Sequence, residues 1–278
     1  MKQRILVAVI GVPALIGVLC FAPDWATAVL VAALCVIGCH EFMGAAAPEK
    51  AAHWWGLAAT LSVFTVFTVY FSGGTFAGST VQKIMTWLLA ALIVVMFIAA
   101  VQAYGKDDEL DFPDISAMAV SGLVIPLALG CLVRLRMLEY GAGLVLIPLV
   151  SAFMSDSLAL FGGMLFGKRK MAPAVSPHKT WAGSVAGLIG SALGLVLWGV
   201  VARMWLGYEP NYLNLILAGL VTNAIGQLGD LAMSLIKREA GVKDYSHIFL
   251  THGGMLDRFD STLFITPWIY LFVCAGML

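Results

Sequence analysis

Long runs of apolar residues, interrupted by short polar stretches, extend along this chain from one end to the other. A helix that spans a bilayer needs about 20 mostly apolar residues, and nine windows come close to this length. Only a helix or a closed barrel satisfies its own backbone polar groups in lipid. We place the windows at 5–22, 25–44, 53–71, 84–103, 116–135, 142–166, 181–203, 212–236 and 260–278. The pattern predicts an all-α, polytopic membrane protein with about nine transmembrane helices.

The overall composition agrees with this class. Hydrophobic residues make up 61% of the chain and the mean hydropathy is +0.94, whereas soluble domains are roughly 45–50% apolar. No linker, low-complexity run or repeat suggests a second domain. We therefore expect one integral membrane domain over 1–278, with about 1–115 as a scaffold and 116–278 carrying the functional motifs. The N-terminal apolar run lacks a small-x-small cleavage site, so we interpret it as an uncleaved first helix rather than a signal peptide.

The distribution of basic residues predicts the orientation in the membrane. With the N-terminus inside and nine spans, twelve of the sixteen Lys and Arg residues fall on the cytoplasmic side. The other side keeps Lys83, Arg134, Arg136 and Arg203. This bias follows the positive-inside rule, so the N-terminus and the basic loops after the sixth and eighth windows should be cytoplasmic, with the C-terminus outside. The net charge is zero, and no nucleic-acid partner is expected.

A polar stripe runs along the eighth window. Its members, Asn223, Gln227, Asp230, Ser234 and Lys237, are spaced 4, 3, 4 and 3 residues apart, which places them on one helical face. Such a face must line a protein interior or a water-filled cavity. Asn223 and Gln227 are either hydrogen-bonding contacts between helices or functional groups. Asp230 requires a cation, which is either a Lys or Arg partner or a bound metal.

A second polar cluster begins the last window. Asp257 and Asp260 are three residues apart, so both can point the same way, and carboxylates suit Mg²⁺, which binds through one or two of them plus substrate phosphates. Arg258 lies between them and can pair with a phosphate. The preceding Gly253-Gly254 pair gives backbone freedom and lets backbone N–H groups approach an anion.

A third polar cluster follows the sixth window. The run Lys168–Lys170 is either a topology determinant or part of a phosphate site. In Ser-Pro-His-Lys-Thr, we expect Pro177 to start the next helix, with Ser176 and Thr180 offering hydroxyls at its positively polarised N-terminus. Asp156, embedded in apolar sequence, needs a partner.

Several kinds of chemistry have no support in this sequence. There is no Ser-His-acid order, Walker loop or His-Glu-x-x-His motif. The pair His40-Glu41 ends the second window, and we interpret it as an interfacial helix-end anchor. What remains is acidic metal ligands beside a basic rim at a membrane face. This combination indicates phosphoryl or nucleotidyl transfer to or from a lipid, chemistry that depends on positioning and charge neutralisation.

The stretch from Ser234 to Asp260, with Ser-x-x-Lys-Arg, Lys-Asp and His-Gly-Gly-x-x-Asp-Arg-x-Asp, resembles the signature of phosphatidate cytidylyltransferases, or CDP-diacylglycerol synthases. Ser-Pro-x-Lys-Thr at 176–180 resembles a second motif of that family. The chain departs from the family pattern at Leu250-Thr251, where Pro-Gly is usual, and at Ala182, where Glu or Gln is frequent. These departures bear on loop conformation and fine contacts rather than on the reaction class.

The resemblance implies a multi-pass, usually homodimeric enzyme of the inner or plasma membrane. It would convert CTP and phosphatidic acid to CDP-diacylglycerol and pyrophosphate, using Mg²⁺, with a second cation left open. Asp230 and Asp257 would bind the metal, with Asp260 as a support or a third ligand. The catalytic set implied is Asp230, Asp257, Asp260, Lys237 and Arg258; the substrate-binding set is Ser176, Lys179, Ser234, Arg238, Lys243, Asp244, His252, Gly253 and Gly254.

Two alternatives stay open at this point. A CTP-dependent kinase or cytidylyltransferase acting on an isoprenoid or ether lipid would use similar groups, because apolar spans do not distinguish lipid tails. From another class, an ion-coupled transporter would use Asp156 and Asp230 as ion sites. A transporter predicts spans broken by Gly or Pro in two symmetric halves, whereas the polar residues here gather in two loops on one side.

Overall fold

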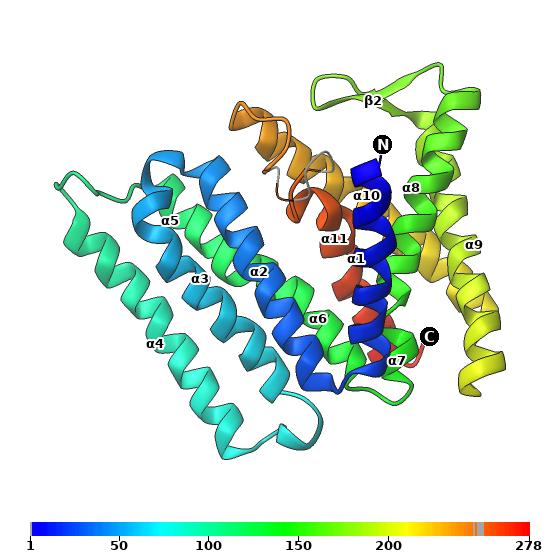
Figure 1. Cartoon of the computed structure of the whole chain (residues 1–278), viewed down its shortest axis with the longest axis horizontal. Coiled ribbons are helices and arrows are strands. Elements are labelled where there is room, and N and C mark those ends of the chain that lie inside the picture. Colours follow the sequence, from blue (N-terminus) through cyan, green and yellow to red (C-terminus); the bar gives the residue numbers. More distant parts are fainter. Residues whose placement is uncertain (1, 247, 249–252) are drawn as a thin grey trace. The chain divides into compact units, whose positions relative to one another are not determined.

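The computed structural model describes residues 2–246, 248 and 253–278, and most of these residues are helical (Figure 1). The elements follow in the order α1 (Lys2–Phe21), α2 (Asp24–Ala46), α3 (Pro48–Phe71), η1 (Gly74–Phe76), α4 (Thr80–Ala103), α5 (Phe112–Ala119), η2 (Val120–Val124), α6 (Ile125–Arg136), α7 (Gly141–Leu144), α8 (Ile147–Phe166), β1 (Lys170–Ala172), β2 (Ser176–Thr180), α9 (Trp181–Leu206), α10 (Tyr212–Glu239) and α11 (Leu256–Cys274).

Each of the nine apolar windows falls on a helix or on a run of consecutive helices. Within the described part of the chain, seven helical segments are long and apolar enough to cross a membrane: Asp24–Ala46, His53–Phe71, Thr80–Ala103, Phe112–Arg136, Gly141–Phe166, Trp181–Leu206 and Tyr212–Glu239. Gly11–Phe21 of α1 is a shorter apolar segment. Helix α11 carries Asp257, Arg258 and Asp260 in its first turns. The helical membrane class is confirmed, whereas the number nine is not.

The chain divides into two compact units. The first consists of Met1–Leu138 and Ala240–Arg258, and the second of Glu139–Glu239 and Phe259–Leu278. Each unit is described by itself below. The expectation of one integral membrane domain stays a prediction.

In the first unit, α3 packs against α2, α4 and the segment formed by α5, η2 and α6 (Figure 1). The approach to η2 is close, because a Cβ on Gly122 would lie 2.9 Å from Cβ of Leu61. The Thr65 hydroxyl donates to the Gly122 carbonyl at 2.9 Å. Helix α4 exposes large apolar side chains such as Trp87 and Val101, a surface compatible with lipid.

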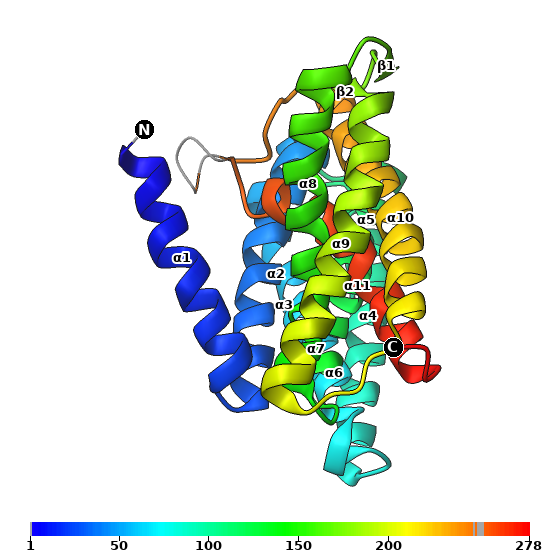
Figure 2. The ribbon, with the colours of Figure 1, turned by 90° about the vertical axis from the view of Figure 1, so that its right-hand side faces the viewer.

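In the second unit, α8 lies along α9, and α9 lies along α10 (Figure 2). Small residues bring these helices together, as is usual inside membranes. A Cβ on Gly190 of α9 would lie 2.6 Å from the Met154 carbonyl oxygen of α8, and one on Gly219 of α10 would lie 2.7 Å from Cα of Ala192. The close packing places the polar stripe of α10 beside α8 and α9.

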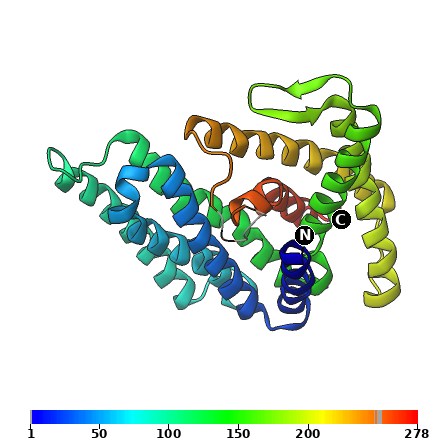
Figure 3. The ribbon, with the colours of Figure 1, turned by 45° about the horizontal axis from the view of Figure 1, so that its top comes forward.

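A short hairpin joins α8 to α9 (Figure 3). Strands β1 and β2 pair antiparallel, with Lys170 opposite Thr180 and Ala172 opposite Ser176. The expectation that Pro177 starts the next helix is wrong, because Pro177 lies within β2. Helix α9 begins after Thr180, whose side chain accepts the Gly183 N–H at 3.1 Å. A threonine N-cap satisfies a helix-end donor and so determines the start.

Candidate active site

A cavity of about 490 Å³ lies in the second unit. Residues of α8, α9, α10 and the hairpin line it, together with Ser261 of α11. The α10 stripe contributes Asn223, Gln227 and Asp230 to its wall. The prediction that this face lines a cavity rather than lipid is therefore confirmed for these three residues.

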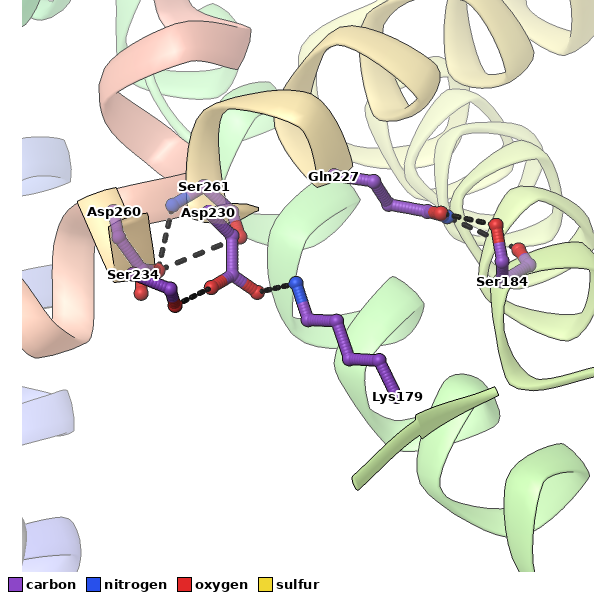
Figure 4. Close-up of polar contacts among 7 residues, drawn as sticks. All are labelled: Lys179, Ser184, Gln227, Asp230, Ser234, Asp260 and Ser261. Carbon is purple, nitrogen blue, oxygen red and sulfur yellow. Dashed lines mark hydrogen bonds and ion pairs between the residues drawn. The ribbon is translucent and has the colours of Figure 1, made fainter. Parts of the chain in front are cut away.

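An ion pair joins the hairpin to α10 inside this cavity. The Lys179 ammonium donates to Oδ2 of Asp230 (Figure 4). The Ser234 hydroxyl lies 3.4 Å from the other oxygen, Oδ1 of Asp230. The two charged side chains are 28% and 22% exposed, so the pair is partly shielded from water and a substrate can still reach it. The cation that Asp230 requires is, in this structure, the lysine of the second motif.

Asp260 adds a second carboxylate beside Asp230 (Figure 4). Its Oδ1 accepts the Ser261 backbone N–H at 2.7 Å. The charges of Asp230, Lys237 and Asp156 all act on the Asp260 carboxyl. Carboxylates of like charge that lie close together create a region where an additional cation is favourable.

The donor set at this point fits Mg²⁺. Across the ranges that the structure describes, no group of three or more His, Cys, Asp or Glu side chains is arranged to hold a metal. Mg²⁺ does not need such a cage, because one or two carboxylates plus phosphates and water complete its shell. Asp230 and Asp260 would supply those carboxylates.

The remaining stripe residues behave differently from one another. Gln227 contacts α9 through both ends of its amide: Oε1 accepts from the Ser184 hydroxyl, and Nε2 donates to the Ser184 carbonyl at 3.0 Å (Figure 4). Gln227 is therefore a contact between helices. Lys237 is only 8% exposed. Asn223 is 1% exposed, and its Nδ2 has no hydrogen-bond partner among the described residues.

In the first unit, the segment 240–258 carries the rest of the signature. Asp257 accepts the backbone N–H groups of Tyr245 and Gly254 through Oδ2, both at 2.9 Å. Gly253 has φ of +79°, and a Cβ there would lie 2.9 Å from Oδ2 of Asp257. This glycine is needed for its left-handed backbone and for the close approach of the carboxylate. The role of Asp257 as a metal ligand stays a prediction.

Glu41 of α2 does not have the role of an interfacial helix-end anchor that the sequence predicts. Its carboxylate is 2% exposed and accepts N–H from Met255 and Leu256, both at 2.8 Å. The Ser246 hydroxyl donates to Oε1 at 2.5 Å. Glu41 is thus a cap for the start of α11 rather than an interfacial anchor. The sequence did carry a signal for this buried role, because Glu41 lies in an apolar window, where a carboxylate needs partners.

Glu41 also changes the interpretation of Gly254. A Cβ on Gly254 would lie 2.4 Å from Oε1 of Glu41. The glycine pair was expected to let backbone N–H groups approach an anion. In this structure, the N–H groups of residues 254–256 donate to the carboxylates of Asp257 and Glu41. Because neither glycine has a side chain, the carboxylates of Asp257 and Glu41 can lie directly against this backbone.

The other predicted substrate-binding residues are spread over both units. In the second unit, Arg238 donates through Nε to the Val175 carbonyl of the hairpin at 3.3 Å, and Ser176 is half-buried in β2. In the first unit, Lys243 and Arg258 are exposed and Asp244 is half-buried. His252 and the Leu250-Thr251 departure lie outside the described residues.

The fold defines a helical membrane protein, and its second unit holds a cavity that brings carboxylates together with a lysine. The chain belongs to the cytidylyltransferase family, whose model matches residues 2–275. A phosphatidate cytidylyltransferase of Haemophilus influenzae is 30% identical, over 98% of this chain and 99% of the relative. Proteins of the same name from Bacillus subtilis and Staphylococcus epidermidis are 32% and 34% identical, over 70% and 69% of this chain and 70% of each relative.

Proposed function

We propose that the chain transfers CMP from CTP to phosphatidic acid, giving CDP-diacylglycerol and pyrophosphate, in a reaction that requires Mg²⁺. The observation that carries the proposal is the contact between Lys179 and Asp230, which joins the second motif to the polar stripe of α10 within one cavity. The relatives named phosphatidate cytidylyltransferase, matched over most of the chain, support the choice of substrates.

The reaction is a direct displacement. An oxygen of the phosphatidate phosphate attacks the α-phosphorus of CTP, the bond from that phosphorus to the bridging oxygen breaks, and pyrophosphate leaves with the bond's electrons. No general base is required, because a phosphomonoester is largely dianionic near neutral pH. When bound, Mg²⁺ neutralises phosphate oxygens and the departing pyrophosphate.

The chain's own residues would bind and orient the reacting groups. The Lys179 ammonium would exchange its Asp230 partner for a phosphate oxygen, and the Asp230 and Asp260 carboxylates would hold the cation. Lys237, Arg238, Lys243 and Arg258 would hold the triphosphate or the lipid phosphate. Because phosphoryl and nucleotidyl transfer depend on positioning and charge, these contacts account for the chemistry without a covalent nucleophile.

The test uses purified protein with phosphatidic acid, Mg²⁺ and CTP labelled at either the α- or the γ-phosphorus. Cytidylyl transfer puts the α-label into the lipid and the γ-label into pyrophosphate. A CTP-dependent lipid kinase would instead put the γ-label into the lipid, and a transporter would label no lipid. Replacing phosphatidic acid by a polyisoprenol phosphate tests the isoprenoid alternative.

The orientation and assembly are further parts of the proposal. The twelve-to-four distribution of basic residues supports cytoplasmic placement of 168–179 and 237–257 and an external Leu278. A C-terminal reporter that is active only in the cytoplasm would contradict this topology. We also propose that the protein lies in the bacterial inner membrane as a homodimer, and cross-linking in native membranes tests the dimer.

A further inference from the structure

Two amides of the same α10 stripe have unequal surroundings. Gln227 uses both ends of its amide on Ser184. Asn223, one turn earlier, is equally able to donate, yet its Nδ2 is buried and has no partner among the residues described. An unsatisfied buried donor is unfavourable, and Asn223 lines the cavity. A ligand atom in the cavity is the group that would satisfy it.

The position of Asn223 limits what that atom can be. Asn223 lies seven residues before Asp230, which is roughly 10 Å along a helix. It also lies toward the middle of α10, away from the basic end with Lys237 and Arg238. If the phosphate of a lipid binds beside Lys179, the acceptors next in line toward its tails are the carbonyl oxygens of the acyl esters.

The wall of the cavity agrees with a lipid in this place. Leu160 and Met164 line it and are 61% and 64% exposed, so an acyl chain can lie against them. No Phe, Tyr or Trp lines the cavity within the described residues, and a nucleic-acid base commonly stacks on such rings. The basic groups Lys170 and Lys179 line the same cavity, where a phosphate would bind.

We propose that Asn223 donates a hydrogen bond from Nδ2 to an acyl-ester carbonyl of the lipid substrate and thereby makes the enzyme selective for ester-linked over ether-linked phosphatidate. This inference rests on the proposed function. It assigns the inner part of the cavity to the lipid glycerol backbone, and it makes Asn223 a specificity residue.

The experiment compares diacyl and dialkyl phosphatidate of equal chain length in mixed micelles with saturating CTP and Mg²⁺. One neutral hydrogen bond predicts that wild-type protein has a kcat/KM about tenfold higher for the diacyl lipid. In Asn223→Leu, which keeps the size but removes the donor, the diacyl-to-dialkyl ratio should fall to near one. The KM for CTP should be unchanged.

Thr222→Val is the matched control. Thr222 is fully buried and donates its hydroxyl to the Ala218 carbonyl of its own helix at 2.7 Å. This control should keep the wild-type ratio. If Asn223→Leu does not accumulate, Asn223→Ser replaces it, with a reduced ratio expected because the serine hydroxyl is shorter.

Different results separate this inference from the function on which it rests. Wild-type protein that forms no lipid-linked CMP from either lipid contradicts the proposed function. Wild-type protein that is active but uses both lipids equally overturns the role of Asn223. So does a variant that keeps the wild-type ratio, and so does one that raises only the KM for CTP, which would assign Asn223 to the nucleotide.

Discussion

Asp230 and Glu41 are both carboxylates within helices of a membrane protein, yet they have different kinds of partner in the two units of the chain. In the second unit, Asp230 pairs with the Lys179 ammonium, and both side chains are partly exposed at a cavity. In the first unit, Glu41 is 2% exposed and accepts two backbone N–H groups and one hydroxyl.

The difference concerns which partners can be exchanged. A lysine side chain rotates freely and can move from a carboxylate to a phosphate. Backbone N–H groups at a helix start cannot move without unwinding the helix. We therefore expect Asp230 to take part in the reaction and Glu41 to position the start of α11.

The largest effect is expected from Asp230→Asn, which keeps the shape of the side chain and removes its charge. Loss of a charge that positions the reacting groups should lower kcat at least about a hundredfold. Asp257→Asn should have a comparable effect if Asp257 binds the metal. Formation of lipid-linked CMP measures both, with expression and detergent stability as controls. Activity within about tenfold of wild type would remove that residue from the principal ligands.

The next effect concerns the basic residues and tests whether they bind phosphates. Lys179→Gln removes the ammonium that would bind a phosphate oxygen, and the loss of this charge-assisted contact should lower activity by a factor of several tens. Arg258→Lys should lower activity about tenfold, because an ammonium does not reproduce a planar two-pronged contact. Membrane orientation should be unchanged. Wild-type kinetics in both variants would show that these residues serve topology only.

A smaller effect is expected from Glu41→Gln. The amide retains one acceptor but turns an NH₂ group toward a backbone donor, and this should destabilise the start of α11 by about 1–3 kcal/mol and lower kcat about tenfold. Thermal unfolding in detergent and hydrogen exchange over 253–258 measure the loss of stability. Formation of lipid-linked CMP measures kcat. His40→Gln is the matched control, because His40 is the exposed neighbour of Glu41. Equal unfolding and equal rates in both variants would contradict a positioning role.

The smallest effect is expected from Ser246→Ala. It removes one of the three donors to Glu41 found among the described residues and leaves the backbone donors in place. A net contribution of about 1 kcal/mol predicts a minor loss of stability and a few-fold lower kcat. A loss as large as that of Glu41→Gln would mean that the hydroxyl, not the backbone, carries the contact.

The sequence by itself determined the helices and the polar face of α10. Hydropathy and the spacing of Asn223, Gln227 and Asp230 are local properties, and helical periodicity converts them directly into a face. The hairpin was not anticipated, because Pro177 favoured a helix start that the Thr180 cap overrode.

Only the tertiary structure decided which polar groups meet. Lys179 and Asp230 are 51 residues apart, and Glu41 and Met255 are 214 apart, so no local pattern could pair them. Asn223 and Gln227 lie on the same stripe, yet Gln227 bonds to Ser184 of α9, whereas Nδ2 of Asn223 has no partner among the described residues. A helical pattern specifies the direction in which a side chain points, whereas the packing of other segments determines what it contacts.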